Sequence, residues 1–359
     1  MPILEKDIII KGDCIEVLKT IPSESIDLIF ADPPYNMQTE GELLRTDGTH
    51  FSGVEDTWDK FSSLQEYDNF CKLWLNECKR ILKKDGAIWV IGSFQNIFRL
   101  GYIMQDLGFW ILNDIIWSKP NAVPNFAGTR FQNSHETLIW CSKNKGAKYC
   151  FNYKTMKALN GNKQMKSVWN IGICIGNERL KDEVGKKIHS TQKPEQLLYN
   201  VIISSTKKDD IILDPFFGTG TTGAIAKRLG RHYIGIEKEE KYINVAKQRI
   251  EDIKTILDIY SENKLDVKPP KISLKELISM QYLREGQLLY SKDRTKTVVL
   301  NDNGYVTFED YTDSIHKVSA RFLNRINNNG WDYFYCEYNG EFVSIDSLRY
   351  LADERRNEQ

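Results

Sequence analysis

The sequence predicts an α/β protein with a doubly wound, mostly parallel sheet, followed by a small α+β domain. Short apolar strands alternate with amphipathic helices from residue 7 to about residue 259, the pattern typical of such a sheet. Two of these strands end in an aspartate that opens a loop, Asp32 and Asp214. After Pro269-Pro270 the pattern changes to short strands. With 359 residues, the chain is long enough for a large and a small domain.

We expect a large domain over residues 1–260, a proline-stiffened linker over 261–270 and a small domain over 271–359. In the large domain we expect strands at 7–11, 26–31, 87–91, 109–117, 136–141, 210–213 and 233–236. The expected helices are 14–20, 64–82, 96–107, 194–205, 221–229 and 241–259. Residues 36–60 show little periodicity and are expected to form a long surface loop. In the small domain we expect strands at 287–291, 296–300 and 305–308, a helix near 319–327, and an Asn-Gly turn before 331–338.

The composition excludes several classes of protein. No apolar run reaches the roughly 18 residues that a membrane span needs, and the N-terminus has no secretory signal pattern, so a cytoplasmic enzyme is expected. The seven cysteines form no Cys-x-x-Cys pair and are odd in number, which argues against a disulfide framework and a zinc site. The five histidines show no metal-binding spacing, so no metal is expected.

The charge is zero overall but unevenly distributed. Residues 1–60 carry 5 basic and 13 acidic side chains, whereas residues 141–193 carry 12 basic and 3 acidic ones. Aromatic residues such as Tyr149, Phe151, Tyr153 and Trp169 interrupt the basic segment. This combination is typical of a surface that contacts phosphates and stacks on bases, although a solvated lysine-rich face explains the charge equally well.

A glycine-rich loop follows the predicted strand at 210–213 and precedes a helix. Gly218, Gly220 and Gly223 match Gly-x-Gly-x-x-Gly, which lets a backbone approach a nucleotide ligand at a helix N-terminus. Asp214 would place a carboxylate beside the pyrophosphate of a dinucleotide, which is unfavourable. A ligand with a cationic group fits better, and S-adenosylmethionine carries an ammonium and a sulfonium. Glu237 ends the next strand, 23 residues after Asp214, where a carboxylate can accept hydrogen bonds from ribose hydroxyls.

The second loop with chemical potential is Asp32-Pro33-Pro34-Tyr35. If the strands before Asp32 and Asp214 are neighbours, both loops open onto one crevice at the switch point of the sheet. An exocyclic amine of a nucleobase is a weak nucleophile, because its lone pair is delocalised. Asp32 and the Pro33 carbonyl can accept its two N–H groups while Tyr35 stacks on the base. Such a base has to be flipped out of the duplex. A tyrosine-packed Pro-Pro turn with no chemical role is the alternative.

These motifs resemble those of the DNA amino-methyltransferases. The Asp-Pro-Pro-Tyr loop precedes the Asp-Pro-Phe-x-Gly-x-Gly-Thr loop, an order similar to the beta group of N6-adenine methyltransferases. The likeness extends over nearly the whole chain to the HinfI and CcrM type, which methylates adenine in GANTC. The motifs that carry it include Asn113–Trp117, Pro124-Asn125-Phe126, Gly128–Phe131, His135-Glu136-Thr137, His189–Glu195 and Asn329-Gly330-Trp331.

The resemblance implies a Rossmann-like, S-adenosylmethionine-dependent methyltransferase sheet with permuted motif order, a homodimer and a nucleoid-associated location. It implies a catalytic loop of Asp32, Pro33, Pro34 and Tyr35. The cofactor residues it implies are Asp13, Cys14, Asp32, His189, Gln192, Lys193, Asp214, Phe216, Gly218, Gly220, Thr221, Thr222 and Glu237. The DNA-contacting residues it implies are Leu43, Leu44, Arg45, Trp58, Asn121, Asn125 and Arg130. The C-terminal domain is expected to contact DNA as well.

The sequence therefore predicts site-specific methyl transfer from S-adenosylmethionine to N6 of a flipped adenine in double-stranded DNA, within GANTC. A cytosine-C5 enzyme would need a cysteine nucleophile, usually in Pro-Cys, and none of the ten prolines precedes a cysteine. Cytosine-N4 transfer, a nicotinamide-dependent oxidoreductase and a DNA-binding module without chemistry remain alternatives. The biological setting is either a restriction–modification system with a cognate endonuclease or an orphan regulatory methylase.

Overall fold

The computed structural model describes residues 4–35, 61–125, 128–182, 185–189, 191–267 and 269–357. The chain forms two compact units, residues 1–266 and 267–359. Within the described part, no helix is long and apolar enough to cross a membrane.

The first unit contains an eight-stranded sheet with the order β1-β8-β7-β2-β3-β5-β4-β6. Its strands are β1 (Ile8–Lys11), β2 (Ile26–Ala31), β3 (Leu82–Gly92), β4 (Trp110–Ser118), β5 (His135–Ser142), β6 (Val168–Asn170), β7 (Ile211–Asp214) and β8 (His232–Glu237). All neighbouring pairs are parallel except β3–β5 and β4–β5. The expected doubly wound, mostly parallel α/β sheet is confirmed, and β5 alone runs against the others.

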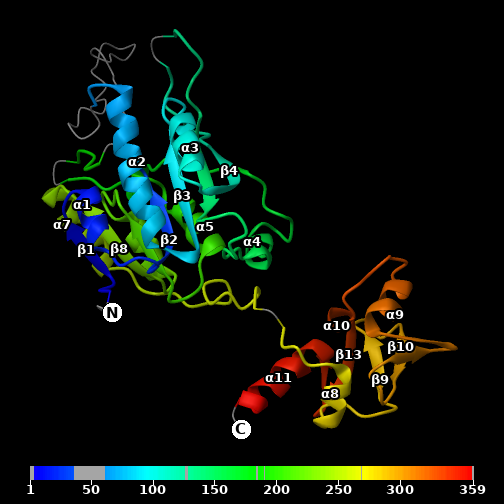
Figure 1. Cartoon of the computed structure of the whole chain (residues 1–359). Helices are drawn as coiled ribbons and strands as arrows, with labels where there is room; N and C mark the ends of the chain where they lie inside the picture. Colours follow the sequence, from blue (N-terminus) through cyan, green and yellow to red (C-terminus); the bar gives the residue numbers. More distant parts are fainter. Residues whose placement is uncertain are drawn as a thin grey trace. The chain divides into compact units, whose positions relative to one another are not determined.

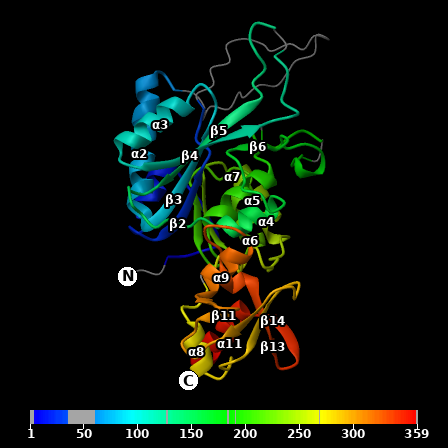
Figure 2. The same ribbon diagram turned by 90° about the vertical axis from the view of Figure 1, so that its right-hand side faces the viewer.

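Helices cover both faces of this sheet (Figure 1, Figure 2). On one face lie α1 (Cys14–Thr20), α2 (Leu64–Ile81) and α3 (Ile97–Asp106), and on the other lie α4 (Tyr153–Leu159), α5 (Glu195–Ser205), α6 (Thr221–Arg228) and α7 (Glu240–Glu251). Successive residues of β2 alternate between the two cores: Ile29 packs with the first group of helices, and Leu28 and Phe30 pack with the second. Burial on both faces explains why these strands are continuously apolar.

The second unit is built on an antiparallel sheet with the order β12-β11-β10-β9-β13-β14. Its strands are β9 (Leu288–Ser291), β10 (Thr297–Leu300), β11 (Val306–Phe308), β12 (Tyr311–Asp313), β13 (Phe334–Tyr338) and β14 (Glu341–Ser344). Its helices are α8 (Leu274–Ser279), α9 (Ile315–Phe322), α10 (Gly330–Tyr333) and α11 (Ile345–Asn357). A separate apolar core, with Leu277, Leu289 and Phe334 fully buried, holds them together.

Two predicted helices were wrong in extent. The helix expected over 241–259 ends at Glu251, because the Lys227 ammonium binds the Ile250 and Glu251 carbonyls and the Ile256 amide donates to the Arg228 carbonyl. The helix expected near 319–327 begins earlier, at Ile315, because the Ser314 hydroxyl caps it by accepting from the Lys317 amide. Elements that were not predicted are α4, β6, α8, β12, β14 and α11, and α10 occupies the start of the segment expected as a strand from Trp331.

Candidate active site

The two acid-ended strands are neighbours. β2 pairs with β7 through Leu28 with Ile212 and Ile29 with Leu213, in parallel. Asp32 follows the last residue of β2 and Asp214 is the last residue of β7. Both aspartates therefore lie at the same edge of the sheet, which we call the catalytic edge, as the sequence led us to expect.

A pocket of about 320 Å³ opens at this edge. All four residues of the predicted catalytic loop line it, together with Asp13, Cys14, Asp32, His189, Phe216, Gly218 and Glu237 of the predicted cofactor set. The lining also includes residues that were not predicted, among them Phe61, Phe70 and Tyr242. Six residues of the predicted cofactor set are not among the described lining residues, and their contacts help to hold the loops that form the pocket wall. They are Gln192, Lys193, Asp214, Gly220, Thr221 and Thr222.

The described lining of the pocket is strongly acidic. It includes Asp13, Asp32, Glu66, Glu237 and Glu239, and its one lysine is Lys238. A pyrophosphate would meet repulsion here, whereas a ligand with a sulfonium and an ammonium would be attracted. The residues present therefore fit S-adenosylmethionine, and they do not favour the nicotinamide dinucleotide alternative.

Glu237 is fixed by three backbone amides. Its Oε2 accepts from the Gly218 amide at 2.7 Å, and its Oε1 accepts from the Lys238 and Glu239 amides at 2.9 Å each. Burial nevertheless raises the pKa of this carboxyl group. Gly218 has φ +51°, a left-handed conformation that favours glycine, and this turn brings its amide to Glu237. Asp13 follows the neighbouring parallel strand β1, whose Lys11 pairs with Glu237, and it caps α1 by accepting from the Ile15 amide at 3.0 Å.

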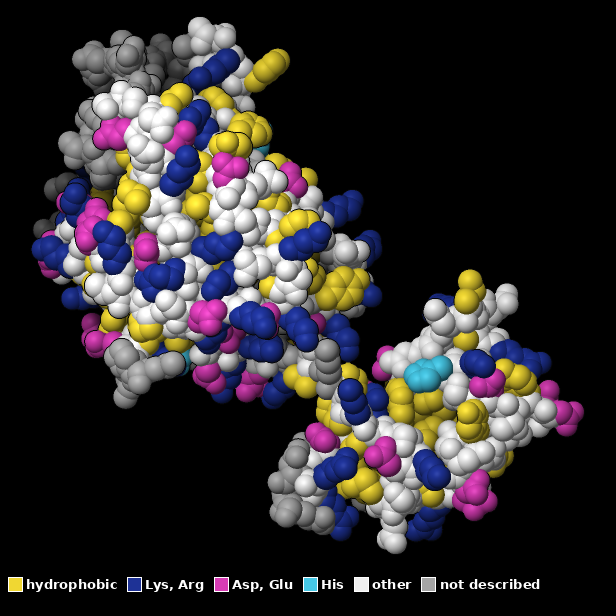
Figure 3. All heavy atoms as spheres, in the orientation of Figure 1, with side chains coloured by type: hydrophobic (Ala, Val, Ile, Leu, Met, Phe, Trp, Pro, Cys, Tyr) yellow, Lys and Arg dark blue, Asp and Glu magenta, His cyan; other side chains and the backbone are white. Residues whose placement is uncertain are grey.

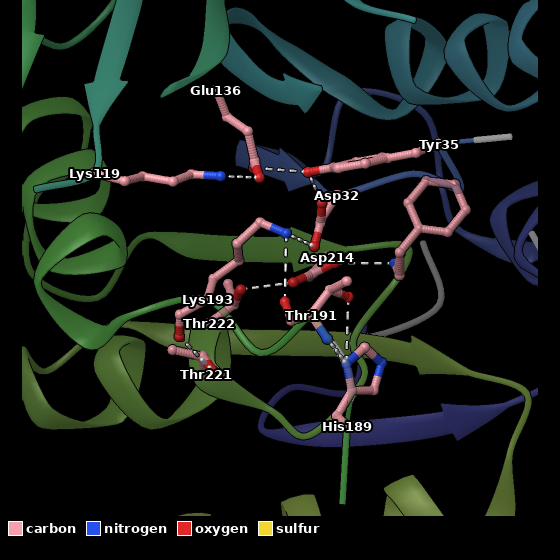
Figure 4. Close-up of polar contacts among 11 residues, drawn as sticks. Asp32, Tyr35, Lys119, Glu136, His189, Thr191, Lys193, Asp214, Thr221 and Thr222 are labelled. Atoms are coloured by element: carbon pink, nitrogen blue, oxygen red, sulfur yellow. Dashed lines mark hydrogen bonds and ion pairs between the residues drawn. The ribbon is translucent and has the colours of Figure 1, made fainter. Parts of the chain in front are cut away.

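Asp214 is buried and held by two donors (Figure 4). Its Oδ1 accepts from the Phe216 amide at 2.9 Å and its Oδ2 from the Thr222 hydroxyl at 2.6 Å. Burial raises the pKa of Asp214 to about 7, with Asp32 and Glu237 adding to the shift. A cationic ligand in the pocket would favour the ionised form.

The other supporting residues connect the pocket to the helices behind it. Gly220 has φ +76°, and a Cβ there would come within 2.8 Å of the Ala246 Cβ on α7. The Thr221 hydroxyl accepts from Arg249 at 2.9 Å. The Gln192 side chain bridges the Leu180 amide and the Glu178 carbonyl. These three residues thus position the loop rather than face the pocket.

His189 is a neutral pocket residue. Burial, together with the nearby Lys193 and Arg179, lowers the pKa of His189 to about 4. Its Nδ1 lies 3.2 Å from the Thr191 amide, and its ring packs against Tyr242 with 4.7 Å between centroids.

The predicted catalytic loop is part of a connected set of charged groups (Figure 4). The Lys193 ammonium donates to Asp32 Oδ2 at 2.6 Å, and the Tyr35 hydroxyl lies 2.9 Å from Asp32 Oδ1 and 3.0 Å from Glu136 Oε2. Lys119 forms an ion pair with Glu136 Oε1. Burial raises the pKa of Asp32, although Lys193 opposes the shift, and burial and both carboxylates raise the pKa of Tyr35.

Sequence reasoning did not identify Glu136 or Lys119 as site residues. Glu136 stands at the start of β5, and the start of an antiparallel strand lies at the edge where its parallel neighbours end. In a parallel α/β sheet, catalytic groups are expected after the carboxyl ends of strands. That rule gives no signal for Glu136, which lies at the amino end of its strand. The His-Glu-Thr motif was the one available hint.

The predicted DNA-contacting residues fall in two places. Leu43, Leu44, Arg45 and Trp58 lie outside the described residues. The others are in the β4–β5 connection, which also begins at the catalytic edge. Asn121 accepts from the Ile173 amide at 2.8 Å, Asn125 donates to the Arg130 carbonyl at 2.9 Å, and the Arg130 guanidinium lies 5.6 Å from the Phe94 ring centroid.

The basic segment 141–193 is divided between opposite edges of the sheet. The Lys143 amide donates to the Gly86 carbonyl, near the start of β3. The Asn152 amide donates to the Ser204 carbonyl, near the end of α5. This part, with Tyr149 and Phe151, is therefore remote from the catalytic edge. β6 ends at the catalytic edge, and His189 and Lys193, which follow it in the chain, lie there too. Lys and Arg side chains of the described residues are scattered over the face of the first unit that Figure 3 shows, without gathering into one patch.

Comparisons with known proteins agree with this geometry. Residues 26–248 match the N6/N4 DNA methylase family model. The chain is 63% identical over 342 residues, 95% of each chain, to the Type II methyltransferase M.HinfI of Haemophilus influenzae. It is 43% identical to the Type II methyltransferase M2.LlaDCHI of Lactococcus lactis subsp. cremoris, over 69% of this chain and 91% of that one.

Solved structures show the same fold. The M1.HpyAVI–SAM complex matches with a TM-score of 0.50 and 26% identity, over 67% of this chain and 98% of that one. The cytosine-N4-specific PvuII DNA methyltransferase matches with a TM-score of 0.54 and 21% identity, over 73% of this chain and 90% of that one. The family expected from the motifs is thus confirmed: the chain belongs to the N6/N4 DNA methylases.

Proposed function

We propose that this chain transfers a methyl group from S-adenosylmethionine to N6 of a flipped-out adenine within GANTC in double-stranded DNA. The observation that carries the proposal is the meeting of two loops at one edge of the sheet. Asp32 lies in an acidic pocket beside the strand that ends in Asp214, with Lys193 holding one of its oxygens. The high identity to M.HinfI supports the adenine and GANTC assignments that its resemblance implies.

The cofactor end of the pocket is formed by Glu237, Asp13, Phe216 and Gly218. We assign Glu237 to the ribose hydroxyls and Asp13 with Cys14 to the region of the adenine. S-adenosylmethionine supplies a methyl group on a sulfonium, which leaves as a neutral thioether. The M1.HpyAVI structure was solved as a SAM complex, which supports the assignment of this pocket.

The catalytic loop positions the target amine. Asp32 and the Pro33 carbonyl accept the two N–H groups, and the Tyr35 ring stacks on the base. The Tyr67 hydroxyl donates to the Pro34 carbonyl at 3.0 Å, which fixes the turn and leaves the Pro33 carbonyl for the substrate. As the N–C bond forms, the amine loses one N–H proton, which the Asp32 carboxylate accepts.

The assignment of Asn121, Asn125 and Arg130 to DNA rests on their connection at the catalytic edge, and the second unit is assigned a DNA-contacting role on the resemblance alone. We also propose a homodimer, for which the exposed Phe98 and Tyr102 on α3 offer an apolar surface. A cognate endonuclease is proposed because M.HinfI is a Type II methyltransferase.

Transfer of a radiolabelled methyl group to duplexes of one length tests the site assignment. One duplex contains GANTC, and the others carry a single base change within it. We expect a kcat/KM at least about 100-fold higher for GANTC, since a mismatched base pair costs about 1–3 kcal/mol and affects both binding and transfer. Equal labelling of all duplexes would refute GANTC as the recognition site, while the proposal of methyl transfer to DNA would stand.

A further inference from the structure

Behind the predicted catalytic loop lies a largely buried group of four charged side chains around one phenol (Figure 4). Asp32 and Glu136 are the carboxylates, Lys193 and Lys119 are the ammonium groups, and the Tyr35 hydroxyl lies between the carboxylates. The four charges balance. Sheet register fixes Glu136, because it pairs with Trp117 on β4, and the Lys119 amide donates to the Ser134 carbonyl.

The Tyr35 hydroxyl has one hydrogen and two carboxylate neighbours. Its oxygen lies 2.9 Å from Asp32 Oδ1 and 3.0 Å from Glu136 Oε2, so it can donate fully to only one of them. The other Asp32 oxygen, Oδ2, is held by Lys193 at 2.6 Å. Oδ1 is therefore the oxygen whose availability depends on where the phenol hydrogen points.

The charges around each carboxylate indicate the direction of this hydrogen bond. Glu136 is paired with Lys119 and feels Lys193 as well, and these ammonium groups lower the pKa of Glu136 despite its burial. Burial raises the pKa of Asp32 even with Lys193 beside it. The surroundings thus favour the charged form of Glu136 more than that of Asp32. Among the described residues, Tyr35 is the hydrogen-bond donor to Glu136 Oε2, whereas Asp32 Oδ1 is also the oxygen that the target amine needs, so the phenol hydrogen is assigned to Glu136.

We propose that Glu136 is a positioning residue for methyl transfer: it accepts the hydrogen bond of the Tyr35 hydroxyl and so keeps Asp32 Oδ1 open to the target amine. This inference rests on the proposed function. Lys119 supports the arrangement by holding the other oxygen of Glu136. With the phenol hydrogen turned away, the lone pairs of the Tyr35 oxygen face Oδ1, which strengthens that oxygen as an acceptor.

The variant Glu136→Gln reverses the key hydrogen bond with little change in shape. Its amide oxygen still accepts from Lys119, so its NH₂ group faces the Tyr35 oxygen and donates to it. The phenol hydrogen then has to point to Asp32 Oδ1, where it competes with the amine. We expect the single-turnover rate of methyl transfer to fall about tenfold, the effect of one misplaced hydrogen bond.

Binding should change little in this variant, because neither the pocket lining nor the face of the Tyr35 ring is altered. We expect the Kd for S-adenosylmethionine and the KM for DNA to stay within about twofold of wild type. Fluorescence of 2-aminopurine at the target position, a measure of base flipping that needs no methyl transfer, should also be unchanged.

A double-mutant cycle with Tyr35→Phe separates this role from a general structural one. Without the hydroxyl there is no hydrogen to misdirect, so adding Glu136→Gln to Tyr35→Phe should change the transfer rate by less than about twofold. Lys119→Gln should lower the rate in the same direction as Glu136→Gln, and this loss should also disappear in the Tyr35→Phe background. It serves as the second probe if Glu136→Gln does not fold.

Asp27→Asn is the matched control. Asp27 also binds a lysine, Lys83, at 2.7 Å, but it lies near the start of β2, at the opposite edge from Asp32. Its transfer rate should stay within about twofold of wild type. An unchanged rate in Glu136→Gln, an equal loss in the Tyr35→Phe background, or an equal loss in Asp27→Asn would each overturn the inference. If the wild-type protein labels cytosine N4, only the adenine assignment is overturned. The role of Glu136 is then tested by the same comparison of variants, with cytosine N4 as the target amine.

Discussion

At the scale of single residues, the two oxygens of Asp32 have different neighbours. Lys193 holds Oδ2, and the Tyr35 hydroxyl lies beside Oδ1. Lys193 also lies 5.2 Å from the centroid of the Tyr35 ring, so one ammonium orients both the acceptor and the stacking surface. The geometry of the amine site therefore depends on a lysine that does not line the pocket.

Asp32→Asn should abolish most methyl transfer and leave cofactor binding close to normal. Asparagine cannot take the amine proton. Its NH₂ group would also face a hydrogen-bond donor, either the Lys193 ammonium or the target amine, so kcat should fall at least about 100-fold. Calorimetry should give a Kd for S-adenosylmethionine within about threefold of wild type, since Asp32 occupies only one part of the pocket wall. Retained kcat would remove Asp32 from the mechanism.

We expect Asp214 to make the affinity for the cofactor depend on pH. In the free protein burial raises its pKa to about 7, so the carboxyl is largely protonated at pH 6. A bound cation favours the ionised form and lowers this pKa, so binding releases a proton and affinity rises with pH until it levels off above about 7. His189, with a pKa near 4, stays neutral over this range.

We expect the affinity for S-adenosylmethionine to increase about three- to tenfold between pH 6 and pH 7.5 in wild type, and to lose most of this dependence in Asp214→Asn. Calorimetric titrations at both pH values measure the effect. An affinity that falls with pH, or an equal slope in the variant, would contradict the role given to Asp214.

At the scale of elements, the residues of the catalytic edge could be predicted where one short stretch of sequence contains both a strand and the motif that follows it. Asp32 and Asp214 each follow a short buried strand, and Gly218 and Gly220 follow Asp214 at once, so one segment of sequence carries each motif. Glu136 was missed because its strand runs antiparallel, and strand direction is set by distant pairing with β3 and β4. The end of α7 was misjudged for a similar reason, since Lys227 and Arg228 on α6 take over its hydrogen bonds.

Gly220→Ala tests how the glycine loop connects α6 to α7. The residue has φ +76°, and a Cβ would lie 2.8 Å from the Ala246 Cβ. Gly161→Ala is the matched control, because Gly161 has φ +60° but a Cβ there meets open space. Both variants place an alanine in the left-handed region, so both lose stability for that reason. Gly220→Ala should lower the free energy of unfolding by about 1–3 kcal/mol more than Gly161→Ala does, and it should weaken cofactor binding. Equal denaturation midpoints for the two variants would show that α7 yields to the extra methyl group.

At the scale of the whole molecule, the chain divides into two units with separate cores. The described lining of the pocket, which includes the predicted catalytic residues, belongs to the first unit. The change of sequence pattern after Pro270 indicated a second unit, but neither its antiparallel strand order nor α11 followed from local patterns, because hairpin pairing is decided by contacts across the core.

Ending the chain after Pro270 should weaken DNA binding more than cofactor binding. If the second unit contacts phosphates, the truncated protein should lose about tenfold or more in DNA affinity and show a shallower dependence of log K on log salt concentration. Its Kd for S-adenosylmethionine should be unchanged, because the described lining of the pocket comes from the first unit. Undiminished DNA affinity would show that the second unit serves another purpose.

The central claim is that the two loops at the catalytic edge transfer a methyl group to adenine N6 in GANTC. The most direct test incubates the protein with methyl-labelled S-adenosylmethionine and two duplexes, one with GANTC and one with the same bases scrambled, and identifies the labelled nucleoside after digestion. The account predicts N6-methyladenine from the GANTC duplex alone. Label in N4-methylcytosine, or no label in either duplex, would contradict it.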